Sequence, residues 1–320
     1  MKHIAVVGAG SFGSAMAYRL SRKNKVKLYA RNLRLVESVN ADGSSISIPV
    51  KFNSSVSATN NLEEALSDAR AVIYAVPVKH SLPFIAEHGT VFQKSSCPIV
   101  SCSKGMMIQE SGRIMTMQQM FAKIGVSAER YASLAGPAFA RSMFQDEPIL
   151  MSLASHTTIE ELDSAWKNAF SVQKTSDVVG QEVCGAMKNV VAIAAGVSST
   201  LGPSAQAATV GVLWNDVGDL IACMGGNKST TTNASMMGDL LATCSPDSRN
   251  FRFGVSCTDI TRPVSHESQT IEGFHSLQAL LTSKELAEKV PGYVQRRFGA
   301  LGSFVRNAID GRTMVNIILE

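Results

Sequence analysis

A single lysine stands in a long stretch of sequence that otherwise carries no charge. Between Val183 and Asn215 the only charged side chain is that of Lys188. An ammonium group among apolar neighbours is costly to bury unless it is paired or gives up its proton. A buried amine of lowered pKa can exchange a proton near neutral pH, so Lys188 is a candidate general acid or base. The alternative is a lysine that reaches water from the edge of a helix.

Residues 238–254 combine an acid, hydroxyl groups and a guanidinium in one short segment that is otherwise rich in apolar side chains. Arg249 and Asn250 offer a forked set of N–H donors, a geometry that suits a phosphate or a carboxylate. The alternative is a helix end with a surface arginine. Asp239, in the same segment, is a candidate counter-ion for Lys188.

Lys104 is a third candidate. It follows the apolar run 98–102, which we interpret as a strand. Open parallel sheets bind ligands at the carboxyl ends of their strands, so Lys104 is expected at the ligand crevice. The alternative is a solvated loop lysine.

A glycine-rich turn, Gly8-x-Gly10-x-x-Gly13, lies between the apolar run 3–7 and a predicted helix over 14–22. In that context the first glycine permits a tight turn, the second lets the backbone approach a pyrophosphate, and the third allows helix and strand to pack closely. The N-terminus of the helix then presents free N–H groups to the anion. The pattern predicts dinucleotide binding, with an empty domain of the same fold as the alternative.

The residue after the second predicted strand, 26–29, bears on the choice of dinucleotide. NAD-selective loops place Asp or Glu there, about 20 residues beyond the glycines. Here Arg31 follows, and the first acid is Glu37. An arginine can pair with a 2′-phosphate, so we expect the protein to accept NADP. NAD is the other cofactor that it could use. The alternative is that Arg31 only stacks on adenine.

The elements that must position these residues fall into two parts. Apolar runs separated by helical patterns occupy the first half of the chain, with strands expected at 3–7, 26–29, 71–76, 98–102, 131–135 and 149–154 and helices at 14–22, 62–69, 109–123 and 159–170. Such alternation indicates an α/β domain with a parallel sheet. Strand-like runs then disappear. We therefore expect a Rossmann-like dinucleotide-binding α/β domain over 1–180 and an all-α substrate-binding domain over 181–320.

Composition narrows the partners and the compartment. The chain has 320 residues and a formal charge of +4 without a dense basic block, which favours two domains and a small anionic substrate over nucleic acid. Its six cysteines form no C-x-x-C pair, which argues against a metal site and for reduced thiols. No apolar run approaches the roughly 20 residues that cross a bilayer, and the first strand begins too early for a leader peptide. We expect a cytoplasmic protein without a membrane span.

Taken together, the motifs resemble those of the soluble, bacterial-type NAD(P)-dependent glycerol-3-phosphate dehydrogenases. The resemblance runs over most of the chain. It rests on Gly-Ala-Gly-Ser-Phe-Gly at 8–13, Ala-Val-Pro at 75–77, Ser-Lys-Gly at 103–105, Leu-Ala-Gly-Pro-Ala-Phe-Ala at 134–140, Asp-Val-Val-Gly-Gln-Glu at 177–182, Met-Lys-Asn-Val-Val-Ala-Ile-Ala-Ala-Gly at 187–196, Gly-Asp-Leu at 238–240, Ser-Arg-Asn at 248–250 and Glu-Gly at 272–273.

The resemblance implies an oxidoreductase of glycerophospholipid metabolism that reversibly reduces dihydroxyacetone phosphate to sn-glycerol 3-phosphate, with hydride moving between nicotinamide C4 and substrate C2. It implies that Lys188 is the general acid–base, oriented and tuned by Lys104 and Asp239. NADP or NAD would contact Gly8, Gly10, Ser11, Phe12, Gly13, Arg31, Lys104, Ala140, Arg249, Thr270 and Glu272. The substrate would contact Lys104, Gly136, Lys188, Asn189, Asp239, Thr243, Ser248, Arg249 and Asn250. A homodimer through the helical domain is an expectation from fold analogy.

Some positions depart from the family pattern. Thr209–Asn227 contains no arginine, Ala138 stands where a hydroxyl residue is common, and the spacing from Asp239 to Ser248 is about one residue short. Two other functions therefore stay open. One is a related reductase acting on a carboxylate substrate, of the 3-hydroxyacid dehydrogenase or ketopantoate reductase type. The other is a non-catalytic NADP-sensing protein.

Overall fold

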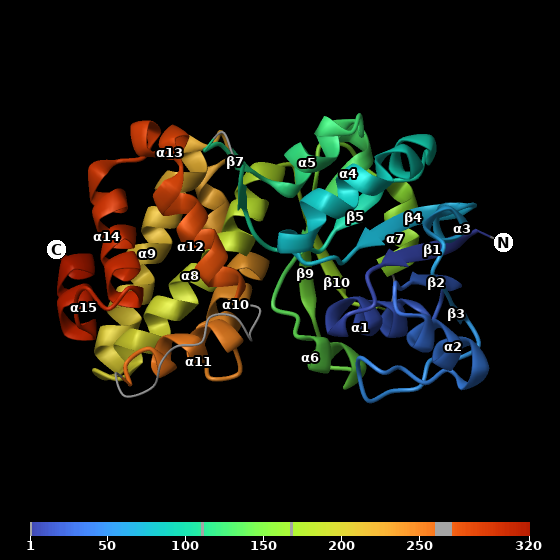
Figure 1. The fold of residues 1–320 in the computed structure, drawn as a ribbon, viewed down its shortest axis with the longest axis horizontal. Helices are drawn as coiled ribbons and strands as arrows, with labels where there is room; N and C mark the ends of the chain where they lie inside the picture. Colours follow the sequence, from blue (N-terminus) through green and yellow to red (C-terminus); the bar gives the residue numbers. More distant parts are fainter. Residues whose placement is uncertain (1, 110–111, 167–168, 260–270) are drawn as a thin grey trace. The chain divides into compact units, whose positions relative to one another are not determined.

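The computed structural model describes residues 2–109, 112–166, 169–259 and 271–320, and Figure 1 shows its elements. The chain divides into two units. The first comprises residues 1–103 and 117–178, and the second comprises 104–116 and 179–320.

The second unit thus takes a segment that was predicted to belong to the first domain. Residues 104–116 contain a small hairpin that packs on helix α12 (Glu272–Thr282) of the second unit. Arg113 Nε of the hairpin lies 3.5 Å from a carboxylate oxygen of Glu285. We expected a single domain boundary near residue 180. One boundary in the sequence cannot separate the two units, because the second unit consists of two segments.

The first unit is built on an eight-stranded sheet with the order β10-β9-β8-β5-β4-β1-β2-β3. Neighbouring strands are parallel except for β8 and β9, which are antiparallel, so the sheet is mixed rather than wholly parallel as expected. Its strands are β1 (His3–Val7), β2 (Val26–Tyr29), β3 (Val56–Thr59), β4 (Ala69–Tyr74), β5 (Ile99–Ser101), β8 (Tyr131–Ala135), β9 (Leu150–Ser155) and β10 (Ser171–Thr175).

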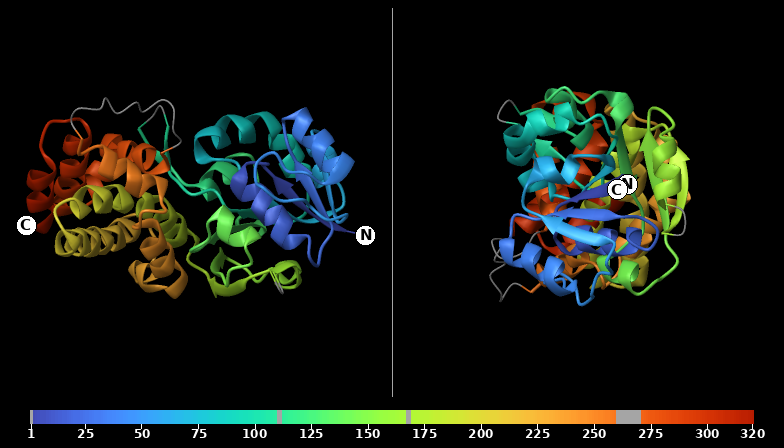
Figure 2. Two further views of the ribbon diagram at one scale, coloured as in Figure 1. Left: turned by 90° about the horizontal axis from the view of Figure 1, so that it is seen from below. Right: turned by 90° about the vertical axis from the view of Figure 1, so that its right-hand side faces the viewer.

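Helices cover both faces of this sheet, with α1 and α6 on one side and α4 and α5 on the other (Figures 1 and 2). Every residue of β1, a central strand, is buried, as expected for a sheet that is covered on both faces. The helices are α1 (Ser11–Leu20), α2 (Leu33–Asp42), α3 (Leu62–Leu66), α4 (Val78–Lys94), α5 (Met117–Lys123), the 3₁₀ turn η1 (Ala128–Arg130), α6 (Ala140–Phe144) and α7 (Glu160–Trp166). The predicted Rossmann-like fold of this part is confirmed.

Two features of this half of the chain were not predicted correctly. The helix expected over 109–123 begins only at Met117, because strands β6 (Met107–Ile108) and β7 (Ile114–Met115) pair before it. Gly112, with φ of +80°, makes the reversal between them, which a helix would not allow. The short strands β3 and β10 were missed, since four or five residues with few apolar side chains give little signal.

Over its described residues, the second unit is helical apart from the β6–β7 pair. Its elements are α8 (Val178–Ser199), α9 (Pro203–Cys223), the 3₁₀ helix η2 (Lys228–Thr232), α10 (Ala234–Thr243), α11 (Arg249–Ser256), α12 (Glu272–Thr282), α13 (Lys284–Lys289), α14 (Gly292–Val305) and α15 (Gly311–Leu319). α8 lies among the other helices of the unit (Figure 1), and every residue from Val190 to Val197 is buried. A helix that is apolar on all sides is expected only where other elements surround it.

α8 also corrects one expectation. By length and composition it is apolar enough to cross a membrane, whereas no such run was expected from the sequence. However, 94% of its most apolar window is buried within the protein, which is the situation of a core helix. Lys188 interrupts the charge-free stretch without stopping the helix.

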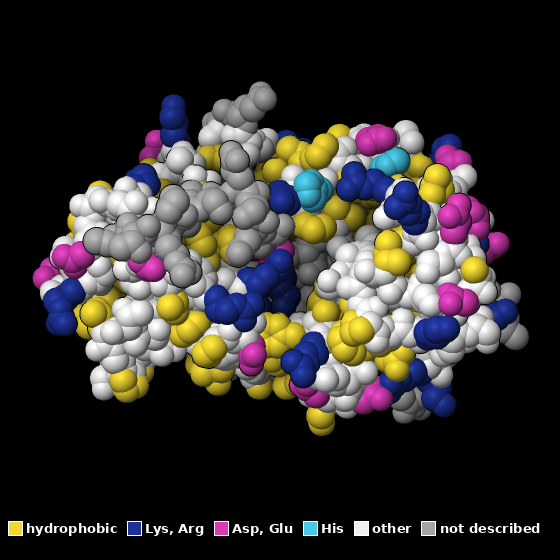
Figure 3. Space-filling model, turned by 60° about the horizontal axis from the view of Figure 1, so that its bottom comes forward, with side chains coloured by type: hydrophobic (Ala, Val, Ile, Leu, Met, Phe, Trp, Pro, Cys, Tyr) yellow, Lys and Arg dark blue, Asp and Glu magenta, His cyan; other side chains and the backbone are white. Residues whose placement is uncertain are grey.

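Figure 3 shows Lys and Arg side chains over much of this face, several of them side by side in one group, and acidic side chains elsewhere on it. This distribution agrees with the small formal charge of +4. The six cysteines are all free, and five of them are buried.

Candidate active site

The turn after β1 has the shape that a pyrophosphate requires. Gly8 has φ of +108°, and a Cβ atom there would lie 2.9 Å from the carbonyl oxygen of Ala75. A Cβ atom at Gly13 would lie 1.8 Å from the carbonyl oxygen of Gly8, so only glycine allows α1 to start this close to the turn. At Gly10 a Cβ atom would meet none of the described atoms within 4 Å, and no side chain caps α1. Open space in front of free N–H groups fits a dinucleotide.

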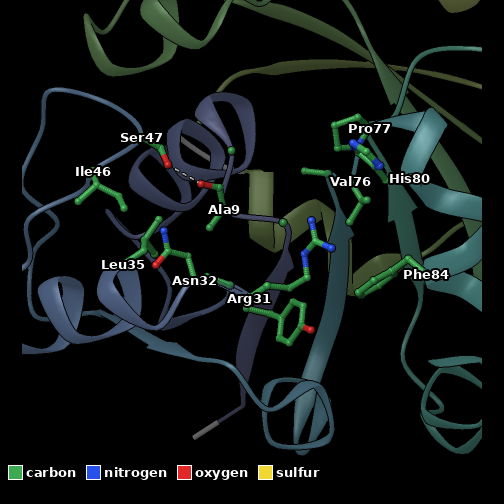
Figure 4. Close-up of a pocket in the computed structure, with 15 residues that line it drawn as sticks. Ala9, Arg31, Asn32, Leu35, Ile46, Ser47, Val76, Pro77, His80 and Phe84 are labelled. Atoms are coloured by element: carbon green, nitrogen blue, oxygen red, sulfur yellow. Dashed lines mark hydrogen bonds between the residues drawn. The ribbon is translucent and has the colours of Figure 1, made fainter. Parts of the chain in front are cut away.

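A cavity of about 390 Å³ opens beside this turn, and Figure 4 shows its walls. They come from the turn, the end of β2, the start of α2, the 46–47 segment and the start of α4. The lining residues are Gly8, Ala9, Gly10, Tyr29, Ala30, Arg31, Asn32, Leu35, Ile46, Ser47, Ala75, Val76, Pro77, His80 and Phe84. The rings of Tyr29 and Phe84 lie 5.9 Å apart and give one side an aromatic surface. The cavity suits a flat base and its ribose.

Arg31 lies in this cavity, as expected from the sequence for a residue near the ribose. In Figure 4 its side chain points to the side where Val76, Pro77 and His80 lie. His80 and Phe84 were not predicted. Ala-Val-Pro at 75–77 was a usable signal, because it places the first turn of α4 at the carboxyl end of β4.

The remaining predicted cofactor residues are distributed over both units. Ser11 and Phe12 form the first turn of α1, and Ser11 Oγ donates to the carbonyl of Ser47 at 3.4 Å. Ala140 is the first residue of α6, and Gly136, which was predicted for the substrate, follows β8. Predicted contacts in the second unit are Lys104, Arg249 and Glu272, whereas Thr270 lies outside the described residues.

Three charged side chains meet inside the second unit. Lys188 Nζ, on α8, donates to one carboxylate oxygen of Asp239 and, at 2.9 Å, to Thr243 Oγ1. Lys104 Nζ donates to the other oxygen of Asp239 at 3.0 Å. Asp239 and Thr243 stand one turn apart on α10 and therefore share a face of that helix. The structure thus supplies the counter-ion that was expected for Lys188.

The Thr243 hydroxyl fixes the direction of these hydrogen bonds. Its hydrogen goes to the backbone carbonyl of Asp239, with 2.6 Å between the oxygens. The hydroxyl oxygen is then left to accept from Lys188. This arrangement holds the amine in place whether or not it carries its third proton.

Burial is the largest influence on all three charged groups, but the outcome differs. For Lys188, burial together with the nearby ammonium of Lys104 outweighs the attraction of Asp239, and its pKa falls to about 8. For Lys104, burial is outweighed by Asp239, and its pKa rises. For Asp239, burial is outweighed by the two ammonium groups, and its pKa falls.

The two lysines pair with the same carboxylate, yet the pKa of Lys188 falls and that of Lys104 rises. The Lys188 side chain is 7% exposed and that of Lys104 is 15% exposed. The ammonium form of Lys188 is therefore the less well hydrated of the two. Burial thus favours loss of the proton from Lys188 over loss from Lys104, whose pKa lies above its ordinary value.

A second set of polar groups continues from Lys188 along α8. Asn189 Nδ2 donates to Glu272 Oε2 at 3.4 Å, and Asn189 Oδ1 accepts from Asn250 Nδ2 at 3.0 Å. Asn250 Oδ1 in turn accepts from the backbone N–H of Gly273 at 3.0 Å. A Cβ atom at residue 273 would lie 2.4 Å from the Asn189 carbonyl, so glycine is needed for α12 to start here. These bonds fix the amide of Asn189 beside the amine cluster.

The predicted fork of Arg249 and Asn250 is wrong in one respect. Asn250 is buried, and its amide is engaged with Asn189 and Gly273 rather than displayed beside the guanidinium. Arg249 is exposed at the first position of α11, and Ser248 caps that helix through its hydroxyl. Successive residues at a helix start point in different directions, which a one-dimensional pattern does not show.

Comparison with known proteins identifies the family. The N-terminal model of NAD-dependent glycerol-3-phosphate dehydrogenase matches residues 3–160, and the C-terminal model matches residues 177–291. The chain belongs to the NAD-dependent glycerol-3-phosphate dehydrogenase family. As a member of this family it is an NAD(P)-dependent oxidoreductase. The two models match most of both parts, and residues 292–320 lie beyond the matched regions.

Individual relatives agree with the family match. A protein named glycerol-3-phosphate dehydrogenase [NAD(P)+] from Chelativorans sp. (strain BNC1) is 34% identical over 262 residues, which covers 79% of each chain. The crystal structure of a glycerol-3-phosphate dehydrogenase from Coxiella burnetii has a TM-score of 0.83 at 27% identity and covers 100% of this chain and 99% of that one. A putative ketopantoate reductase from Ralstonia solanacearum MolK2 reaches a TM-score of 0.58 at 11% identity, covering 96% and 99%, and shares only the fold.

Proposed function

We propose that the chain reversibly reduces dihydroxyacetone phosphate to sn-glycerol 3-phosphate, with NADPH or NADH as reductant. The observation that carries the mechanism is the buried amine of Lys188, held between Asp239 and Thr243 with a pKa of about 8. A proton donor of that pKa is matched to chemistry near neutral pH. The proposed division of work is dinucleotide binding in the first domain, predicted over 1–180, and substrate binding in the helical domain, predicted over 181–320.

In this mechanism the residues of the second unit supply the proton and hold the ketone. A bound nicotinamide would supply a hydride, with its two electrons, for the carbonyl carbon C2. Negative charge develops on the carbonyl oxygen, where the Lys188 ammonium stabilises it and then transfers one proton to it. Lys188 is left as a neutral amine, still donating to Asp239, and regains its proton from solvent. Lys104 keeps Asp239 ionised through the cycle, which keeps Lys188 oriented.

The phosphate is assigned to Arg249 at the start of α11. Its exposed guanidinium and the N-terminal end of that helix both favour an anion. Ser248 and Thr243 are proposed as further contacts, and Asn189 and Asn250 as groups that shape this side of the site. The phosphate is remote from the reacting carbon, so its binding positions the ketone rather than activates it.

Replacing Arg249 by Lys tests the phosphate assignment. We expect the KM for dihydroxyacetone phosphate to rise by about tenfold or more, because an ammonium cannot reproduce the two parallel bonds of a guanidinium. The change in kcat should be smaller. Steady-state kinetics give both constants, and Arg252→Lys, on the same helix, is the matched control. An unaltered KM in the Arg249 variant would place the phosphate elsewhere.

The pH dependence of the reaction should follow Lys188. Ketone reduction needs the ammonium form, so kcat/KM for dihydroxyacetone phosphate is expected to fall as pH rises through about 8. Oxidation of sn-glycerol 3-phosphate needs the neutral amine and should rise through the same range. Rates in both directions between about pH 6 and about pH 10 give the two profiles. Profiles that move together would exclude Lys188 as the shared acid–base group.

The direct test of the function is NADPH oxidation with dihydroxyacetone phosphate, repeated with NADH and with ketopantoate. Turnover of the ketone phosphate alone supports the proposal. Turnover of ketopantoate instead would indicate the carboxylate-reducing alternative. Tight NADPH binding without turnover of either would indicate a non-catalytic sensor.

We propose further that the protein acts in the cytoplasm as a homodimer with no membrane span and no nucleic-acid partner. Its six free thiols fit a reducing compartment. Met237 and Leu241, on α10, are 38% and 66% exposed, and such apolar groups fit a subunit contact through the helical domain. Light scattering on the purified chain measures the oligomeric state.

A further inference from the structure

His80 is a titratable side chain in the wall of the first unit's cavity, apart from the chemistry assigned to the second unit. It is the third residue of α4, and its backbone N–H donates to the carbonyl of Pro77 at 2.9 Å. The side chain is exposed and lines the same cavity as Arg31. Figure 4 shows the Arg31 side chain pointing to the side where His80 lies. Two potential cations from different elements therefore face one space.

The surroundings of His80 are cationic. Arg31, at the end of β2, and Lys79, its neighbour on α4, both disfavour its protonation, and Tyr29 is the other titratable group of the cavity wall. No Asp or Glu occurs among the described residues that line the cavity. Partial burial makes the largest contribution to the lowered pKa of His80, and these two cations contribute the rest. In the absence of an anion, the imidazole is therefore harder to protonate than that of an ordinary histidine.

The space between these side chains has the chemistry of a phosphate site. The N-terminal end of α4 adds the positive end of a helix dipole, and no described side chain caps that helix. The cavity also provides the aromatic surface for a base. An anion on the ribose would meet a guanidinium from one side and an imidazole from the other.

We propose that His80 joins Arg31 in binding the 2′-phosphate of NADP, and that it makes the preference for NADPH over NADH rise as pH falls. This inference rests on the proposed function for the identity of the cofactor. It adds a specificity-determining residue and a pH dependence that Arg31 alone would not give, because a guanidinium does not titrate in this range.

The sign follows from proton linkage. A phosphate dianion stabilises the imidazolium form, so binding raises the pKa of His80 and takes up a proton. Lower pH therefore strengthens NADPH binding until His80 is already protonated in the free protein. NADH has no charge at this position and its affinity should not follow His80. The 2′-phosphate itself becomes protonated below about pH 6, which limits the useful range to about pH 6.5 to 8.

The test measures binding rather than turnover. Dissociation constants of NADPH, NADH, 2′,5′-ADP and 5′-AMP are measured by calorimetry for the full chain and for H80Q, R31A and K79Q. For the wild type, the ratio of the 5′-AMP to the 2′,5′-ADP constant should be about three- to tenfold larger at about pH 6.5 than at about pH 8. H80Q should remove this pH dependence. R31A should lower the ratio at both pH values.

K79Q is the matched control, because it removes a neighbouring cation that does not line the cavity. It should keep the pH dependence of the ratio. If H80Q keeps it as well, or if the wild-type ratio does not change with pH, His80 does not contact the 2′-phosphate. Wild-type turnover of dihydroxyacetone phosphate in the same buffers separates the two proposals: turnover without the pH-dependent ratio removes only the role of His80, and the ratio without turnover removes only the dehydrogenase.

Discussion

Replacing Lys188 by Ala should lower kcat for reduction of dihydroxyacetone phosphate by about 10²- to 10⁴-fold, the range typical for loss of a general acid. The substitution removes the amine of the ionic cluster whose pKa lies near 8. The fold should persist, because Asp239 keeps its ion pair with Lys104. NADPH binding should persist too, since the cavity assigned to the dinucleotide lies in the first unit. Steady-state rates, NADPH fluorescence titration and a thermal scan measure these three properties.

Lys289→Ala is the control for the loss of a lysine from the same unit. Lys289 forms an exposed pair with Glu285, and its removal should leave kcat unchanged. A Lys188 variant that retains most of the wild-type kcat would remove this residue from the mechanism. In that case Lys104 would be the next proton donor to test.

Replacing Asp239 by Asn is expected to destabilise the protein by about 3–5 kcal/mol, the cost of leaving buried charge without its partner. Two ammonium groups would then face a neutral amide. Lys188 can relieve part of this by losing its proton, so its pKa in the folded variant should fall further below the unfolded value. The unfolded chain then binds more protons, and the stability deficit should shrink as pH rises. Thermal scans at about pH 7 and about pH 9.5 compare the two conditions, and kcat should also fall because Lys188 loses its orienting partner.

The control is Asp219→Asn, which acts on an acid of the same unit. Asp219 pairs with Lys228 and accepts from Tyr293, but these partners reach solvent and can rehydrate. Its loss of stability should be smaller and nearly independent of pH. Equal losses in the two variants would show that Asp239 has no special electrostatic role.

The sequence predicted those parts of the fold in which pattern and packing agree. β1, β2 and β8 were expected at their observed positions, because most of their side chains are apolar. The hairpin before α5 was missed, since Met107, Ile114 and Met115 fit a helical pattern as well as a strand. Only the left-handed backbone at Gly112 distinguishes the two, and a single glycine is weak evidence in sequence.

The site was predictable where one residue type carries an energetic penalty. Lys188 was found because a lone charge in an apolar helix needs a partner, and Asp239 was proposed as its counter-ion. The orientation of neighbouring side chains was not predictable. Arg249 and Asn250 are adjacent in sequence, yet one is exposed and the other is held by Asn189. Ser47 lines the cavity only because a loop brings it there, and loop paths leave little trace in composition. His80 lines it from the start of α4, a helix that was not predicted.

The assignment of residues 104–116 to the helical unit matters for anyone who wishes to dissect this enzyme. A fragment ended at the apparent domain boundary would carry Lys104 away on the wrong piece and leave Asp239 with one amine instead of two. Neither half would then be an independent module, and chimeras exchanged at that point would inherit mismatched halves of one ionic cluster. To join the helical unit to another nucleotide-binding domain, residues 104–116 would have to be transferred with it.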